Sequence, residues 1–350
     1  MEWKAVADRI QPVSREYLDA AWQRLDDLTK PKRSLGLLEE LAARYSAIRR
    51  DTSPRITGKA VFVFAGDHGV VDEGVSAYPR EVTTLMVKTF LAGGAGINVL
   101  ARCAGADVHV VDIGMATPLP GAPGLIQRCV RRGTGNILRE PAMSREEADR
   151  AIDVGIEMAQ SAHKRGVSIL ATGDMGIGNT TPSSALFAAL LPAHARDVTG
   201  RGTGLDDAGL NSKVRVIESA LERASRELGD PVSALAAVGG LEMAGICGLC
   251  LGGACLQMAV LVDGFISSAG ALAAMRINPA VADYLIFSHH SVERGHRVFF
   301  DREGLRPVLH LDMRLGEGTG AALAMQILEN GVRVLNEMAT FADAGITPAT

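Results

Sequence analysis

Six short apolar runs alternate with longer helical patterns along this chain of 350 residues. Each run is continuously apolar, which is typical of a strand buried on both faces, and Gly, Asp or His residues follow each one closely. The runs cover residues 60–65, 108–111, 167–171, 259–262, 284–287 and 307–311. Buried strands that alternate with helices predict an α/β fold built on a parallel sheet.

Apolar residues that recur every three or four positions predict helices between and after these strands. The predicted helices cover residues 145–165, 207–228, 241–256, 264–276 and 321–344. Residues 1–50 also have a helical pattern and precede every strand, so we expect them to pack apart from the sheet. The Pro- and Gly-rich segment 115–142 is long for a connection, and we expect it to cover the fold or contact a partner.

Composition narrows the class of protein. The chain is 47% hydrophobic but only 4% aromatic, and its net charge of −4 comes with no basic cluster, so no nucleic-acid partner is expected. Residues 243–262 could span a membrane by length, yet their four glycines and the Asp263 that follows favour a buried helix and strand. Five cysteines in mostly apolar surroundings, and an N-terminus without an apolar signal region, predict a cytoplasmic protein without membrane contact.

Two Gly-rich loops suit a phosphate. Residues 173–182 (GDMGIGNTTP) follow a predicted strand, and their backbone N–H groups, with the hydroxyls of Thr180 and Thr181, could bind an anion at a helix start. The loop has neither the Walker A nor the GxGxxG pattern, so ATP and NAD are not indicated. Residues 200–204 (GRGTG), with Lys213 nearby, could hold the same phosphate ester. An ordinary strand-to-helix turn is the alternative interpretation of the first loop.

One carboxylate is distinguished by its neighbours. Glu317 lies between Gly316 and Gly318, directly before the predicted helix 321–344. Glycines on both sides allow a ligand to approach the backbone, and a helix start favours an ionised carboxylate and a polarised substrate. The alternative is an acid that only caps the helix, which would leave a non-catalytic nucleotide-binding module.

A metal-dependent hydrolase is the other alternative. It would use Asp67, His68, His289 and His290. The cysteines at 247, 250 and 255 lack the second Cys or His pair that a zinc site needs, so we expect no metal and no cofactor.

These motifs together resemble the nicotinate-nucleotide:dimethylbenzimidazole phosphoribosyltransferases, which make the lower nucleotide of cobalamin. The matching segments extend over nearly the whole chain and lie within residues 30–36, 67–75, 173–182, 238–240, 263–265 and 314–325. The resemblance implies a Rossmann-like large domain at 51–320 and a small helical domain from 1–50 plus 321–350. It also implies a homodimer that moves phosphoribose from nicotinate mononucleotide to a benzimidazole nitrogen.

The resemblance assigns roles to individual residues. Glu317 matches the general base of the family. The resemblance also implies a set of substrate-binding residues, to which we add residues at neighbouring positions. The full set is Asp174, Gly176, Gly178, Asn179, Thr180, Thr181, Gly202, Lys213, Asp263, Arg314, Leu315, Gly316, Tyr78 and Met86.

The chain departs from the family at three of these positions. Asp174 replaces a Glu, and Tyr78 and Met86 replace polar residues of the base pocket. These departures suggest a somewhat different set of lower bases, such as hydroxylated or methylated benzimidazoles.

Overall fold

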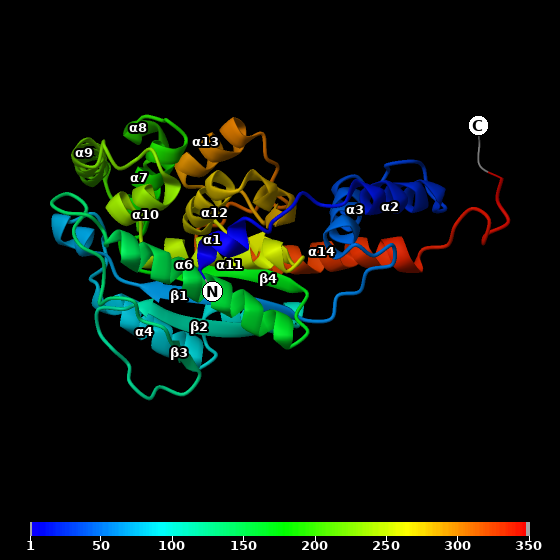
Figure 1. Ribbon diagram of the computed structural model, residues 1–350, viewed down its shortest axis with the longest axis horizontal. Coiled ribbons are helices and arrows are strands. Elements are labelled where there is room, and N and C mark those ends of the chain that lie inside the picture. Colours follow the sequence, from blue (N-terminus) through cyan, green and yellow to red (C-terminus); the bar gives the residue numbers. More distant parts are fainter. Residues whose placement is uncertain (1, 348–350) are drawn as a thin grey trace.

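Six parallel strands form the central sheet of the computed structural model, which describes residues 2–347 (Figure 1). Their order is β3-β2-β1-β4-β5-β6, so the direction of chain progression reverses between β1 and β4. The strands are β1 (Lys59–Gly66), β2 (Asp107–Gly114), β3 (Leu125–Gln127), β4 (Ile169–Met175), β5 (Ala259–Val262) and β6 (Leu285–Phe287). The predicted α/β fold with a parallel sheet is confirmed.

Two features of the sheet differ from the sequence prediction. β3 lies inside segment 115–142, where its three residues are too short to stand out between prolines and glycines. Residues 307–311 do not form a strand, and only an isolated bridge joins Leu309 to His289. Pro307 has no N–H to donate, and Asp312 has a left-handed φ of +52°, which turns the chain away from the sheet.

Helices cover both faces of the sheet. On β1, Phe64 faces α11 (Leu241–Cys255), whereas Val61 points to the opposite side, towards the start of α14 (Thr319–Glu337). α6 (Arg145–Lys164) and α12 (Phe265–Ile277) pack against α11, and α4 (Glu81–Leu91) and α5 (Gly96–Ala104) lie between β1 and β2 in the chain. Further helices are α1 (Trp3–Ala7), α7 (Thr180–Leu190), α8 (Ala195–Val198), α9 (Asp207–Arg223), α10 (Pro231–Val238), α13 (Arg294–Glu303) and the 3-10 helices Gly69–Glu73 and Pro279–Tyr284.

The uncharged segment 243–262 is a buried helix followed by a buried strand, as predicted. Its glycines allow backbone contact between α11 and α6, because a Cβ added at Gly248 would lie 1.9 Å from the Ile152 carbonyl oxygen. A different stretch, Glu81–Ala104, has the length and hydropathy of a membrane span. In the structure it is divided into α4 and α5 by a break at Gly93 and Gly94.

Two N-terminal helices lie away from the sheet, beside the C-terminal half of α14 (Figure 1). They are α2 (Arg15–Asp27) and α3 (Leu37–Arg49), and with Leu335 of α14 they share a hydrophobic cluster of their own. α14 starts two residues before the predicted helix and ends at Glu337, beyond which Thr340 forms a bridge with Leu28. The proposed domain division stays a prediction, and its last residues, 348–350, lie outside the described chain.

Candidate active site

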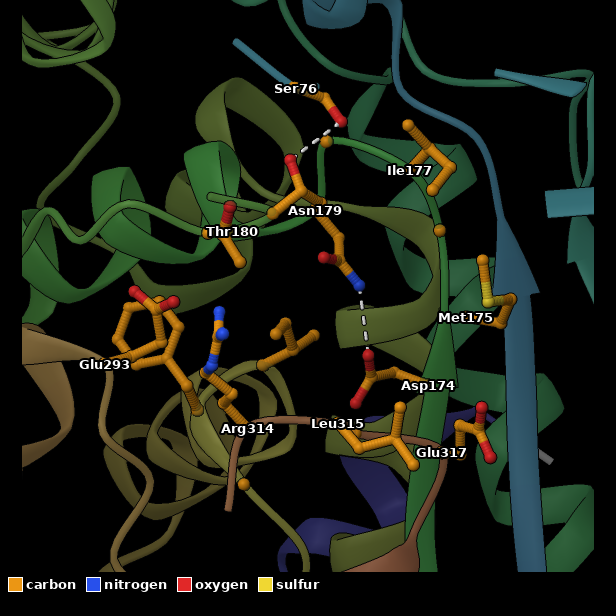
Figure 2. Close-up of a pocket in the computed structure, with 18 of the residues that line it drawn as sticks. Ser76, Asp174, Met175, Ile177, Asn179, Thr180, Glu293, Arg314, Leu315 and Glu317 are labelled. Carbon is orange, nitrogen blue, oxygen red and sulfur yellow. Dashed lines mark hydrogen bonds between the residues drawn. The ribbon is translucent and has the colours of Figure 1, made fainter. Parts of the chain in front are cut away.

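A cavity of about 700 Å³ opens at the carboxyl ends of the strands, beside the switch point between β1 and β4 (Figure 2). Its walls come from segments that follow β1, β4, β5 and β6, together with the turn before α14. The predicted site residues that line it are Tyr78, Met86, Asp174, Gly176, Gly178, Asn179, Thr180, Gly202, Arg314, Leu315, Gly316 and Glu317. Side chains from distant parts of the sequence therefore meet in one place.

Glu317 is a buried carboxyl in the cavity wall. Its side chain is almost fully buried, with 4% exposed, and its Oε2 accepts a 3.1 Å hydrogen bond from the backbone N–H of Ile97 at the start of α5. Burial raises the pKa of the Glu317 carboxyl, the Ile97 N–H opposes that shift, and the negative charge of Asp263 adds to it. Glu317 is therefore a better proton acceptor than an exposed glutamate.

The backbone of Glu317 is in an unusual conformation. Gly316, Glu317 and Gly318 have φ angles of +82°, +64° and +96°, all in the left-handed region. This conformation is easy for glycine but costs a residue with a Cβ roughly 1–2 kcal/mol. The Glu317 carbonyl also lies against β4, where a Cβ added at Gly173 would be 2.5 Å from it. Glycines before, after and opposite Glu317 thus permit the turn.

Asp174 is a second carboxyl in the same cavity. It is 6% exposed, and its Oδ2 accepts a 3.0 Å hydrogen bond from the Asn179 side chain, towards which it points in Figure 2. Burial is the main cause that raises the pKa of Asp174 well above its usual value, and the charges of Asp263, Glu242 and Glu317 add to it. Neighbouring carboxyls with different pKa values can hold different protonation states at one pH.

The two Gly-rich loops meet around Thr180, the first residue of α7. Lys213 lies behind them rather than in the cavity wall: its Nζ donates hydrogen bonds to Thr180 Oγ1 (2.7 Å) and to the Gly200 carbonyl (3.3 Å). Burial lowers the pKa of Lys213 to about 8, and the charge of Glu293 opposes that shift. Gly202, with φ +54°, lies so close to Thr180 Oγ1 that an added Cβ would be 2.7 Å away. The structure therefore brings together the components predicted for an anion site.

Two other predicted substrate-binding residues do not line the cavity. Thr181 is fully buried in the first turn of α7, and Asp263 is fully buried at the end of β5. Asp263 accepts hydrogen bonds from the backbone N–H groups of Gly318, Gly320 and Ala321. Both residues lie next to the site, without direct access to its interior.

One wall of the cavity is apolar. Tyr78 and Met86 come from the segment after β1, Met175 ends β4 and Ile177 follows it, and Leu315 lies beside Glu317. Tyr78 and Leu315 are more than half exposed, at 56% and 60%. This wall suits a flat aromatic ring.

Sequence reasoning missed Glu293, and it placed His289 at the common edge of the sheet without a substrate-binding role. In Figure 2, Glu293 and Arg314 lie on one side of the cavity, and Met175 and Ile177 lie on the other. His289 follows β6 and was recognised only as a metal candidate, whereas Glu293 lies at the start of α13, beyond the polar cluster, where no sequence signal marks it. Other lining residues without a prior role are Val75, Ser76, Val82, Thr203, Gly264, Phe265, Ile266 and Ser291.

The arrangement of the histidines does not support the metal-dependent hydrolase. His68 Nε2 lies 3.0 Å from Glu242 Oε1, whereas His289 Nε2 lies 3.8 Å from Asp263 Oδ1. Within residues 2–347, no three His, Cys, Asp or Glu side chains are grouped so that they could hold a metal ion. His68 and His289 are instead each paired with a buried carboxylate.

Comparisons with known proteins give one consistent result. A family model described as Phosphoribosyltransferase (DBI_PRT) matches residues 10–346. Nicotinate-nucleotide--dimethylbenzimidazole phosphoribosyltransferases from Geobacter sulfurreducens and Geobacter sp. (strain M21) are 56% and 54% identical to this chain, over 97% of it and 96% and 97% of their own lengths. The crystal structure of CobT from Thermus thermophilus matches with a TM-score of 0.92 and 47% identity, over 95% of this chain and 100% of that one. The chain therefore belongs to the nicotinate-nucleotide--dimethylbenzimidazole phosphoribosyltransferase family.

Proposed function

We propose that this protein transfers phosphoribose from nicotinate mononucleotide to 5,6-dimethylbenzimidazole or a related base. The products are nicotinate and α-ribazole 5′-phosphate, the nucleotide used in cobalamin assembly. The observation that carries this proposal is the position of Glu317, a buried carboxylate with a raised pKa between an apolar wall and a Gly-rich anion cradle. The substrates themselves are inferred from the family to which the chain belongs.

The reaction needs alignment and one proton acceptor. A benzimidazole nitrogen forms a bond to C1′ of the ribose while the bond from C1′ to the pyridinium nitrogen breaks, and the configuration at C1′ inverts. The electron pair of the broken bond stays on the pyridine nitrogen, which leaves as a neutral ring without a proton. The other benzimidazole nitrogen then carries an acidic N–H, and Glu317 accepts this proton.

The 5′-phosphate would lie at the start of α7. Backbone N–H groups of Gly176 and Gly178 and the hydroxyl of Thr180 come from one loop, and Gly202 comes from the other. Lys213 would act on the phosphate through Thr180, and Arg314 supplies a positive charge in the cavity wall. A helix N-terminus with these partners is a typical phosphate site.

The base would lie against the apolar wall. Tyr78, Met86 and Met175 give this wall large, polarisable side chains, which tolerate rings of different outline. We infer that the protein accepts other benzimidazoles besides the dimethyl form, including hydroxylated or methylated ones. A competition assay with equimolar bases tests this inference, and exclusive use of dimethylbenzimidazole would contradict it.

We infer that two copies of the chain associate in the cytoplasm. Large apolar side chains remain exposed in the single chain, among them Tyr78 and Leu315 of the cavity wall, and Leu85 and Leu311. A second copy is a reasonable cover for such a surface. Analytical ultracentrifugation should give twice the chain mass, and a monomer at micromolar concentration would contradict the inference.

The function itself is tested by product identification. The purified protein is incubated with nicotinate mononucleotide and a panel of benzimidazoles, and the products are separated and identified by mass. We expect nicotinate and one ribotide per accepted base, in equal amounts. Release of nicotinate without any ribotide would mean that water, rather than a base, attacks C1′, and the proposal would fail.

A further inference from the structure

The turn that carries Glu317 has no capping side chain of its own. Gly318 is the N-cap of α14, and it cannot accept a hydrogen bond through a side chain. The left-handed φ angles at Gly316, Glu317 and Gly318 also leave the turn without a regular backbone pattern. The free N–H groups at the start of α14 therefore need an acceptor from elsewhere in the fold.

Asp263 supplies that acceptor from the end of the neighbouring strand β5. Its Oδ2 accepts a 3.1 Å hydrogen bond from Gly318 N–H, and its Oδ1 accepts hydrogen bonds from Gly320 N–H (2.8 Å) and Ala321 N–H (3.1 Å). One carboxylate thus binds three backbone donors on both sides of the helix start. Its two oxygens are occupied by the protein itself, which leaves little capacity for a substrate.

Asp263 is itself firmly placed. It is fully buried, its N–H donates a 3.0 Å hydrogen bond to Thr172 Oγ1 on β4, and its carbonyl accepts a 2.9 Å hydrogen bond from Ser288 Oγ after β6. His289 Nε2 lies 3.8 Å from its Oδ1. Asp263 therefore connects the turn to three adjacent strands, β4, β5 and β6.

The charge of Asp263 also acts on Glu317. It adds to burial, the larger cause, in raising the pKa of the Glu317 carboxyl. Loss of this negative charge should therefore lower the pKa of Glu317 and make it a weaker proton acceptor.

We propose that Asp263 is a positioning residue for the general base: it holds the turn 316–321 so that the Glu317 carboxylate faces the cavity. This inference rests on the proposed role of Glu317 as proton acceptor. Asp263 then has no contact with the reacting atoms and acts only through the turn and its charge.

The test is the substitution Asp263→Asn, assayed with nicotinate mononucleotide and dimethylbenzimidazole. An amide keeps the shape but loses the charge and one acceptor. We expect kcat to fall at least 10-fold, both KM values to stay within about threefold, and the acid limb of the kcat–pH profile to move to lower pH. A large rise in either KM with an unchanged acid limb would indicate a substrate contact and would overturn the proposal.

A double substitution tests whether Asp263 affects turnover only through Glu317. If Asp263 acts only through Glu317, Asp263→Asn combined with Glu317→Gln should be no slower than Glu317→Gln alone. Losses that multiply would overturn the proposal. If Glu317→Gln alone keeps normal turnover, the proposed function of Glu317 fails; if only Asp263→Asn keeps it, this inference fails and the role of Glu317 stands.

Asp112→Asn is the matched control. Asp112 is equally buried at the end of β2 and binds Met115 N–H and Arg132, away from the turn. Its substitution should leave kcat per folded molecule and the pH profile unchanged. If Asp263→Asn does not fold, Thr172→Val removes only the hydroxyl that fixes the Asp263 amide. It should lower kcat about threefold without moving the acid limb, and an unchanged kcat would overturn the proposal.

Discussion

Lys213 lies behind the candidate phosphate site and contacts Thr180, which lines it. The Lys213 ammonium donates a 2.7 Å hydrogen bond to Thr180 Oγ1, which leaves the hydroxyl hydrogen of Thr180 able to point into the cavity. The positive charge thus polarises a hydroxyl that faces the ligand, while the charge itself stays fully buried. Such a charge is sensitive to pH, because burial lowers the pKa of Lys213 to about 8.

This pKa predicts how substrate capture depends on pH. As pH rises through about 8, free Lys213 loses its proton, and the Thr180 hydroxyl loses its charged partner. We expect kcat/KM for nicotinate mononucleotide to fall on this alkaline side, because kcat/KM reports the ionisations of the free enzyme and free substrate. Steady-state rates between pH 6 and 10 measure this fall, and a flat profile over that range would contradict the prediction.

Substitution of Lys213 tests whether this residue causes the alkaline fall in kcat/KM, called the alkaline limb below. Lys213→Met should raise KM for nicotinate mononucleotide about 10- to 100-fold, as expected for loss of a hydrogen bond from a charged group, and should remove the limb. Lys164→Met, on the exposed end of α6, is the matched control and should change neither. An alkaline limb that survives in Lys213→Met would belong to another group.

Removal of the base function at Glu317 should affect turnover more than binding. Glu317→Gln keeps the size of the side chain but cannot accept the benzimidazole proton, so kcat should fall by roughly 10²-fold or more while KM changes little. In the unsubstituted protein, kcat should decline as pH falls through the raised pKa of Glu317. Normal turnover by the variant would remove Glu317 from the mechanism.

A side chain added at Gly173 should displace the turn that carries Glu317 and so also lower turnover. Gly173→Ala would place a Cβ 2.5 Å from the Glu317 carbonyl oxygen and 3.2 Å from the Gly318 nitrogen, and backbone atoms cannot easily move away. We expect a loss of about 1–3 kcal/mol of unfolding free energy, measured by denaturant titration, and a fall in kcat.

Gly229→Ala is the control for this substitution. No atom lies within 4 Å of a Cβ added there, and Gly229 has no left-handed φ, so stability and turnover should be unchanged. A Gly173→Ala protein with normal kcat would show that the turn tolerates displacement.

The sequence predicted the sheet and most of the cavity because both depend on local pattern. Continuous apolar runs identified β1, β2, β4, β5 and β6, and the residues that follow parallel strands necessarily meet at one edge. The three-residue strand β3 carries too few apolar positions to be distinguished from a loop. Residues 307–311 are apolar enough for a strand, but they form only an isolated bridge at Leu309 and a few backbone hydrogen bonds beside it.

The contacts of the buried residues behind the cavity wall could not be predicted from the sequence. Lys213 and Asp263 were both recognised as site residues, yet their contacts are with Thr180 and with the backbone of α14. Contacts with backbone N–H groups leave no trace in residue type, because any residue at those positions would supply them. Glu293 lies in the wall without any motif around it, and only the packing of α13 brings it there.

The buried Asp174 carboxyl should make the folded protein less stable at neutral pH, although turnover depends on it. Burial, its largest cause, together with neighbouring negative charges, raises its pKa well above the value of an unfolded chain, so the ionised form is disfavoured in the folded protein. Well below the ordinary Asp pKa of 3.8 the carboxyl is neutral in both states and has no effect. As pH rises from there towards the raised pKa, the unfolded chain loses the proton first, and the folded protein becomes relatively less stable. Asp174→Asn should therefore be more stable than the unsubstituted protein at pH 8 and nearly equal to it at pH 4.

Thermal unfolding at these two pH values measures the difference, and turnover is measured on the same samples. We expect the Asn variant to gain stability and lose activity, because an amide cannot change its charge beside Glu317. Asp301→Asn, at a well-exposed position on α13, should change neither quantity at either pH. Equal stability of Asp174→Asn and the unsubstituted protein at pH 8 would mean that the folded protein tolerates an ionised Asp174. The acidic cluster around Glu317 would then carry a full additional negative charge, and the anionic substrate would have to bind against it.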